Sequence, residues 1–157
     1  VAAISSAARE RPYMDLDRVG IIGHSFGGYF TVRALLQAPD FYKVGVASGI
    51  PEMDEQMSSI ANEVYTGVLK DKEQFVQRYA NYPLADKLKG HLLLAIQTSD
   101  SNTPAFGALK LIDALIAADK PHDVLMLPGA NHHFRGSDRR YFYERAGAYF
   151  KEHLQGG

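Results

Sequence analysis

Four short apolar segments, each followed by a turn signal and then by a helix-like pattern, constrain the fold of this chain most. The segments are Arg18 to Gly23, Lys43 to Ser48, His91 to Thr98 and Asp123 to Leu127. Short apolar runs without polar alternation are typical of strands buried on both faces, as in parallel sheets. Strand–helix alternation builds βα units with right-handed crossovers. The sequence therefore predicts an α/β fold with a parallel sheet of about four strands flanked by helices.

Amphipathic stretches separate the predicted strands. The first ends before Pro39 and has its apolar residues at helical spacing, namely Tyr29, Val32, Leu35 and Leu36. We expect Thr103 to cap the next helix, with Pro104 at its first position. The apolar face expected for that helix consists of Leu109, Ile112, Leu115 and Ile116. The last helix is expected to open at Ser137, and the segment from Pro51 to Asn81 is expected to form helical insertions over one end of the sheet.

The composition excludes several classes of function. The 157 residues contain no cysteine, which removes disulfides, thiolate metal sites and a cysteine nucleophile. Lys and Arg total 17 against 18 Asp and Glu, and no basic block occurs, so nothing indicates a nucleic acid or an anionic membrane as a partner. The longest apolar runs, such as Leu92 to Ile96, are far too short to span a bilayer. No metal ion or cofactor is predicted.

The sharpest chemical motif is Gly23 to Gly27, GHSFG, which leaves a predicted strand and enters a predicted helix. In this context G-x-S-x-G is typical of the nucleophile elbow of α/β-hydrolases, a strained turn that projects its serine above the sheet. Small residues are expected two positions before and after Ser25, because the tight turn brings them close to neighbouring backbone. The helix behind Ser25 aims free N–H groups at a developing oxyanion, and the backbone N–H of Phe26 is the predicted donor.

A serine nucleophile needs a base, and the base needs a carboxylate that orients it. In α/β-hydrolases the three residues follow in the order Ser, Asp or Glu, His. Asp100 directly follows the third predicted strand and is therefore the predicted acid. The other aspartates downstream are worse placed, since Asp113 lies in mid-helix and Asp119 and Asp123 lie at the opposite end of the sheet.

Two of the six histidines lie where the base is expected, in the loop after the last predicted strand. These are His132 and His133, and their position alone does not choose between them. The others precede a strand, lie in the final helix or neighbour the nucleophile, and they are His91, His122, His153 and His24. We expect His24 to point away from Ser25 across the elbow.

The segment from Asp17 to Tyr29 (DRVGIIGHSFGGY) closely resembles the nucleophile region of the prolyl oligopeptidase family, in the branch of the dipeptidyl and acylaminoacyl peptidases. Further similar stretches are Leu35 to Phe41, Pro83 to Leu94, Leu111 to Lys120, Pro128 to His132 and Phe150 to Leu154. The resemblance covers nearly the whole chain. It implies that Ser25 is the nucleophile and Asp100 the acid. It also implies that His132 is the base, because the family's histidine is normally followed by glycine, and His133 stands in that place.

The same resemblance implies where substrate is held. Asn102 falls where the dipeptidyl peptidase branch has an asparagine that helps to hold the substrate backbone. The tyrosines that form a proline pocket in members like dipeptidyl peptidase IV fall on Met57 and Ala61 here. Met and Ala are apolar but lack the flat rings that favour stacking on proline. We therefore expect an apolar specificity pocket that is not selective for proline.

The resemblance further implies that residues 1–157 are the C-terminal part of an α/β-hydrolase catalytic domain. They would carry the last four strands, without the first four strands, the second oxyanion donor and the N-terminal propeller. The strand at Val19 to Ile22 would then be an apolar edge, which we expect to pair with a second copy or with the missing N-terminal part. The predicted function is a serine peptidase that acts on peptide substrates through an acyl-enzyme on Ser25. The alternatives are a carboxylesterase and a catalytically inert truncated fragment.

Overall fold

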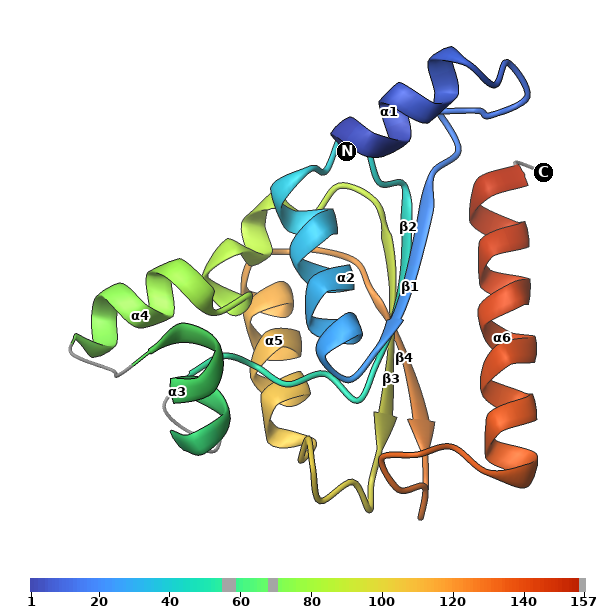
Figure 1. The fold of residues 1–157 in the computed structure, drawn as a ribbon. Coiled ribbons are helices and arrows are strands. Elements are labelled where there is room, and N and C mark those ends of the chain that lie inside the picture. The colour runs from blue at the N-terminus through green and yellow to red at the C-terminus, as the bar shows by residue number, and fades with distance from the viewer. Residues whose placement is uncertain (55–58, 68–70, 156–157) are drawn as a thin grey trace.

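The computed structural model describes residues 1–54, 59–67 and 71–155, and Figure 1 shows their arrangement. The helices are α1 (Ala2–Arg9), α2 (Phe26–Gln37), α3 (Ser59–Thr66), α4 (Lys72–Tyr79), the 3₁₀ helix η1 (Tyr82–Lys87), α5 (Phe106–Ala117) and α6 (Gly136–Gln155). The strands are β1 (Gly20–His24), β2 (Val44–Ser48), β3 (His91–Gln97) and β4 (Asp123–Leu127). They form one parallel sheet in the order β1-β2-β3-β4, which confirms the predicted fold class.

Helices cover both faces of the sheet. Helices α2 and α5 lie on one face and α6 lies on the other (Figure 1). Strand β3 shows why both faces need cover, because successive side chains of a strand point to opposite sides. Leu92 and Leu94 pack into the core beneath α2 and α5, whereas Leu93 and Ala95 pack against α6. The continuous apolar runs of the sequence therefore correspond to strands that are buried on both faces.

The helix after β3 begins later and faces the core differently from the prediction. Its N-cap is Ala105, without a side-chain cap, so the expected capping role of Thr103 is wrong. Its buried residues are Gly107, Ala108, Leu111 and Leu115. Leu109 and Ile116 are 52% and 65% exposed, so only part of the predicted apolar face is correct. Apolar residues surround most of this helix, and its close approach to the loop after β2 selects the buried stripe: a Cβ on Gly107 would lie 3.2 Å from the Glu52 nitrogen.

The described parts of the segment between β2 and β3 contain helices, as predicted. Its elements α3, α4 and η1 lie on the same side of the sheet as α2 and α5, with α3 and α4 farther out (Figure 1). A small apolar core attaches this segment to the rest of the domain. It consists of Tyr29 of α2, Met53 of the loop after β2 and Phe75 of α4. Among residues 1–54, 59–67 and 71–155, no helix is both long and apolar enough to cross a lipid bilayer.

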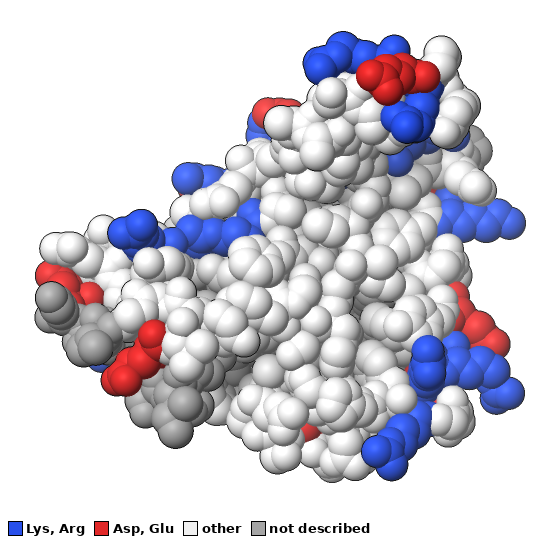
Figure 2. Space-filling view, in the orientation of Figure 1, with Lys and Arg blue, Asp and Glu red and all other residues white. Residues whose placement is uncertain are grey.

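Strand β1 lies at one edge of the described sheet, and its Ile22 side chain is 46% exposed. Figure 2 shows the molecule in the orientation of Figure 1. On the face seen there, Lys, Arg, Asp and Glu lie around the rim, while the middle is uncharged. An uncharged edge strand is a ready template for pairing with another segment of polypeptide. Pairing through Val19 to Ile22 remains a prediction.

Candidate active site

The turn between β1 and α2 holds Ser25 in a backbone conformation that side chains rarely adopt. Its φ is 58° and its ψ is −127°, in the region where non-glycine residues are strained. The Ser25 N–H donates to the Ser48 carbonyl at 2.9 Å and ties the turn to the end of β2. This strand–turn–helix geometry is that of a nucleophile elbow, and it presents the serine hydroxyl at the carboxyl end of the sheet.

Close approach of backbone explains two glycines of the elbow and corrects the expectation for a third. A Cβ on Gly23 would lie 2.1 Å from the Gly27 carbonyl oxygen, and one on Gly28 would lie 2.6 Å from the Ser48 carbonyl oxygen. A Cβ on Gly27 would meet nothing within 4 Å. The crowded position after the serine is therefore Gly28, which packs α2 against β2, rather than Gly27.

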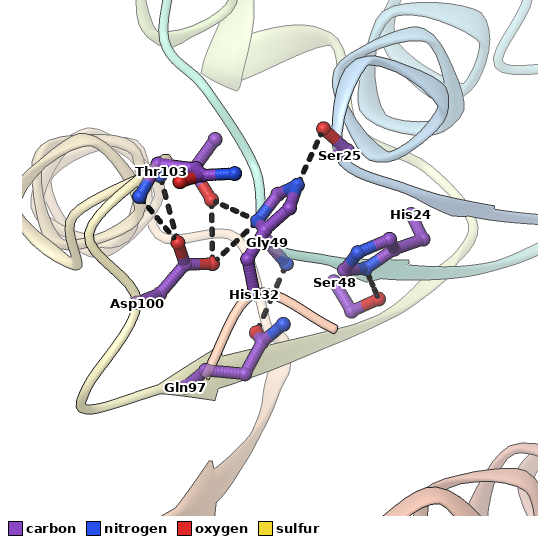
Figure 3. Close-up of polar contacts among 9 residues, drawn as sticks. His24, Ser25, Ser48, Gly49, Gln97, Asp100, Thr103 and His132 are labelled. Atoms are coloured by element: carbon purple, nitrogen blue, oxygen red, sulfur yellow. Dashed lines mark hydrogen bonds and ion pairs between the residues drawn. The ribbon is translucent and has the colours of Figure 1, made fainter. Parts of the chain in front are cut away.

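Three predicted residues meet at the carboxyl ends of the strands (Figure 3). His132 Nε2 lies 2.9 Å from Ser25 Oγ, and His132 Nδ1 lies 2.8 Å from Asp100 Oδ2. Ser25 follows β1, Asp100 follows β3 and His132 follows β4, so the parallel sheet brings together groups far apart in sequence. His133 is exposed, and its ring meets the His132 ring edge-on at 5.2 Å. The histidine that reaches Ser25 is His132.

The Asp100 carboxylate accepts four hydrogen bonds. Oδ1 accepts from the backbone N–H groups of Asn102 and Thr103 at 2.9 and 2.8 Å. Oδ2 accepts from the Thr103 hydroxyl at 2.7 Å and faces His132 Nδ1. Burial alone would raise the pKa of Asp100, but the hydrogen bonds from Thr103 and His132 outweigh burial and lower that pKa below its ordinary value. The carboxylate is therefore ionised at neutral pH and orients the imidazole with Nδ1 protonated.

Thr103 is a member of this cluster that sequence reasoning missed. Its hydroxyl lies 2.7 Å from Asp100 Oδ2 and 3.2 Å from His132 Nδ1. The available signal was the spacing of Asp100, Asn102 and Thr103, because aspartate side chains commonly accept from backbone N–H groups two and three residues later. Thr103 is a residue type that often caps helices, but here its hydroxyl donates to the Asp100 carboxylate instead of capping α5.

The predicted oxyanion donor, the backbone N–H of Phe26, belongs to the first residue of α2, where helical N–H groups have no partner within the helix. The Phe26 ring stacks on Tyr65 at 4.6 Å and on Tyr29 at 5.4 Å. Tyr65, at the end of α3, is thus an aromatic neighbour of the elbow that sequence reasoning did not single out. Ala61 lies in the same helix, whereas Met57 lies outside the described residues.

Asn102 lines a cavity of about 380 Å³ beside His132. The other lining residues include Asn131, His133, Arg135 and Asp138. These are polar or charged groups, so the space next to the imidazole suits polar parts of a bound molecule. Within the described ranges, no group of three or more His, Asp or Glu side chains is arranged to hold a metal ion.

The fold and the elbow define a class of protein, the α/β-hydrolases with a serine, a histidine and an aspartate at the carboxyl ends of the strands. Comparison with known proteins narrows this class. The family model described as "Prolyl oligopeptidase family" matches residues 1–157. The chain belongs to that family of serine peptidases, which confirms the resemblance found in the sequence.

Similar proteins within the family carry dipeptidyl peptidase names. The chain is 29% identical over 147 residues to human "Dipeptidyl peptidase 8", and the match covers 92% of the chain and 16% of the relative. It is 27% identical over 157 residues to rat "Inactive dipeptidyl peptidase 10", covering 99% of the chain and 20% of the relative. A crystal structure of a putative dipeptidyl aminopeptidase IV from Bacteroides ovatus superposes with a TM-score of 0.90 at 29% identity. That superposition covers 98% of this chain and 22% of the other. The chain thus spans about a fifth of these relatives.

Proposed function

We propose that the protein carrying this chain is a serine peptidase in which Ser25 is the nucleophile, His132 the general base and Asp100 the orienting acid. The observation that carries the proposal is the unbroken hydrogen-bonded series from Ser25 Oγ through both nitrogens of His132 to Asp100. One relative is named inactive, so family membership alone does not imply turnover. The proposal therefore rests on this chain's own three side chains.

The mechanism follows from the positions of these groups. His132 Nε2 accepts the hydroxyl proton as Ser25 Oγ attacks the carbonyl carbon of a peptide bond. The backbone N–H of Phe26 stabilises the oxyanion of the tetrahedral intermediate. His132 then donates the proton to the leaving amine as the C–N bond breaks, which leaves an ester on Ser25. A water molecule gives a proton to His132 and attacks that ester, and collapse of the second intermediate returns the proton to Ser25. Asp100 stabilises the imidazolium in both halves.

For the substrate, we propose a peptide whose backbone is held in part by Asn102. The residue before the scissile bond would meet an apolar pocket that includes Met57 and Ala61, neither of which offers an aromatic ring to proline. We further propose that residues 1–157 form the C-terminal part of a larger catalytic domain, in line with the fraction of the relatives that the chain covers.

Activity of the full-length protein on peptide amides and on simple esters tests the proposal. We expect hydrolysis of dipeptidyl amides, with no advantage for proline over alanine before the scissile bond. We expect Ser25→Ala to abolish turnover and labelling by a fluorophosphonate probe without changing the melting temperature, because the hydroxyl contributes little packing. Esterase activity without amide hydrolysis would favour the carboxylesterase alternative. A wild-type protein that neither labels nor turns over either substrate would refute the proposal.

A further inference from the structure

The ring of His24 lies against the imidazole of His132. The two ring centroids are 4.7 Å apart, with the planes tilted by 42°. His24 is next to Ser25 in sequence, but its ring contacts the hydroxyl of Ser48. The structure also brings its ring to the group that contacts the serine. Figure 3 shows His24 and Ser48 on one side of His132, and Asp100 and Thr103 on the other.

Neighbouring groups hold the His24 ring in place. Its Nδ1 lies 2.9 Å from the hydroxyl of Ser48, a fully buried residue at the end of β2. The Phe134 ring lies 5.3 Å away, centroid to centroid. On a further side the backbone is so close that a Cβ on Gly49 would lie 3.0 Å from His24 Cε1. A ring confined in this way can act as a fixed surface for its neighbour.

The surroundings also keep His24 uncharged. Burial lowers its pKa below the ordinary histidine value, and the charge of His132 lowers it further. The ionisable groups that face it are His132 and His133, which disfavour its protonation, and Asp100, which favours it more weakly than burial opposes it. A neutral ring can lie against His132 in both its neutral and its imidazolium form, whereas a second cation would repel the imidazolium.

The hydrogen bonds of His132 are made by its two ring nitrogens and do not restrain the faces of the ring. They join Nδ1 to Asp100, with the Thr103 hydroxyl 3.2 Å from the same nitrogen, and Nε2 to Ser25, whose hydroxyl can rotate with the ring. Small rotations about its Cα–Cβ and Cβ–Cγ bonds would tilt the imidazole while both bonds persist in weakened form. A contact against the ring face opposes that tilt directly, and the His24 ring supplies one.

We propose that His24 is a positioning residue for the base: its neutral ring, pinned by Ser48, holds the face of His132 so that Nε2 stays on Ser25 Oγ. This inference rests on the proposed function, in which His132 is the base. It assigns His24 no contact with substrate. Loss of the ring should therefore lower kcat and leave KM nearly unchanged.

Variants of the full-length protein can separate the ring from its hydrogen bond. His24→Ala removes both, His24→Asn keeps a polar atom for Ser48 without the ring, and His24→Phe keeps a ring without the polar atom. Combining His24→Phe with Ser48→Ala removes both members of the His24–Ser48 hydrogen bond, so that neither is left buried without the other. We expect Ala and Asn to lower kcat and the fluorophosphonate labelling rate about 10- to 100-fold, the loss typical of a misplaced catalytic group. The Phe variants should stay within about threefold of wild type, and KM should change by no more than about twofold in all of them.

The pH profile and a crystal structure provide readouts that a merely structural role would not move. The acid limb of kcat/KM should report one proton in the wild type and in His24→Phe, because the lowered pKa of His24 keeps that ring neutral. A two-proton limb in the wild type that becomes a one-proton limb in His24→Phe would overturn the proposal. In crystals, His132 should lie within hydrogen-bond reach of Ser25 in the wild type and be displaced in His24→Ala. An undisplaced His132 would refute the positioning role even if no substrate were turned over, and equal activity of the Asn and Phe variants would refute the role of the ring.

Discussion

Two buried carboxylates on neighbouring loops of this protein have pKa values that are shifted in opposite directions. Asp100, after β3, accepts four hydrogen bonds, and its pKa is lowered. Glu52, after β2, is 3% exposed, and its pKa is raised to about 7. Burial penalises both anions, so the difference lies in the donors that each loop supplies. The loop that carries the proposed acid is built to hold a charge, and the loop of Glu52 is not.

The surroundings of Glu52 explain its raised pKa. Its Oε2 accepts from the Asn81 backbone N–H at 2.8 Å, while Oε1 has no hydrogen-bond partner within the described ranges. Burial is the main cause of the shift, and the charge of nearby Asp54 adds to it. Asp54 is itself fully buried but forms an ion pair with Lys110 at 2.8 Å. Lys110 therefore pairs with Asp54 rather than with Glu52.

The largest effect should come from neutralising the proposed acid. Asp100→Asn in the full-length protein keeps the size of the side chain but favours the wrong tautomer of His132, so kcat should fall about 10⁴-fold. Steady-state kinetics on the substrate that the wild type cleaves best measures the loss, with Asp113→Asn on the exposed side of α5 as the matched control. Retention of more than about a tenth of wild-type kcat would show that Asp100 does not orient the base.

Glu52→Gln should instead change stability and leave turnover unaltered. A raised pKa means that the folded protein binds the Glu52 proton more tightly, so the stabilisation is fully present below about pH 4.5 and is lost as pH rises to about 7. Over that range this shift corresponds to a loss of about 3 kcal/mol of unfolding free energy as an upper bound. Glutamine keeps an oxygen for the Asn81 N–H and carries no charge. The variant should therefore melt higher than wild type at pH 8 and at the same temperature near pH 4.

Melting curves of the two proteins over a pH series measure this difference, with exposed Glu10→Gln as the control. A constant offset between wild type and Glu52→Gln at every pH would show that Glu52 does not titrate in the folded protein near neutrality. A change in kcat/KM at pH 8 would mean that this loop and the proposed site are coupled. Glu52 would then affect turnover as well as stability.

The smallest effect should come from removing one donor to Asp100. Thr103→Val has nearly the same shape but lacks the hydroxyl that lies 2.7 Å from Asp100 Oδ2. A hydrogen bond to a charged group contributes about 1.5–3 kcal/mol, and the remaining donors retain the rest of the cluster, so kcat should fall about tenfold. Thr103→Ser should restore activity, since it restores the donor. If Val and Ser variants have the same kcat, the hydroxyl serves packing alone.

The sequence predicted the features that depend on neighbours along the chain. Each strand was marked by its own apolar run, and the elbow by glycines within two residues of Ser25. Asp100 was found because chain order and strand ends locate it. The choice of His132 over His133 came only from the family resemblance, because two adjacent loop histidines have the same local signal. Pairing through Val19 to Ile22, and the substrate contacts of Met57 and Ala61, remain predictions.

The tertiary structure alone decided the contacts between loops. His24 and His132 are 108 positions apart, and no local pattern indicates that their rings meet. Thr103 has the sequence signal of a helix cap. Its hydroxyl nevertheless donates to Asp100, because the loop places it beside that carboxylate and α5 begins only after Ala105. Helix α5 is apolar on most sides, and its packing against the sheet and η1, together with the approach of Gly107 to the loop of Glu52, buries Leu111 rather than Leu109. Local signals determine which elements form, whereas burial and hydrogen bonding between distant segments determine which side chains meet.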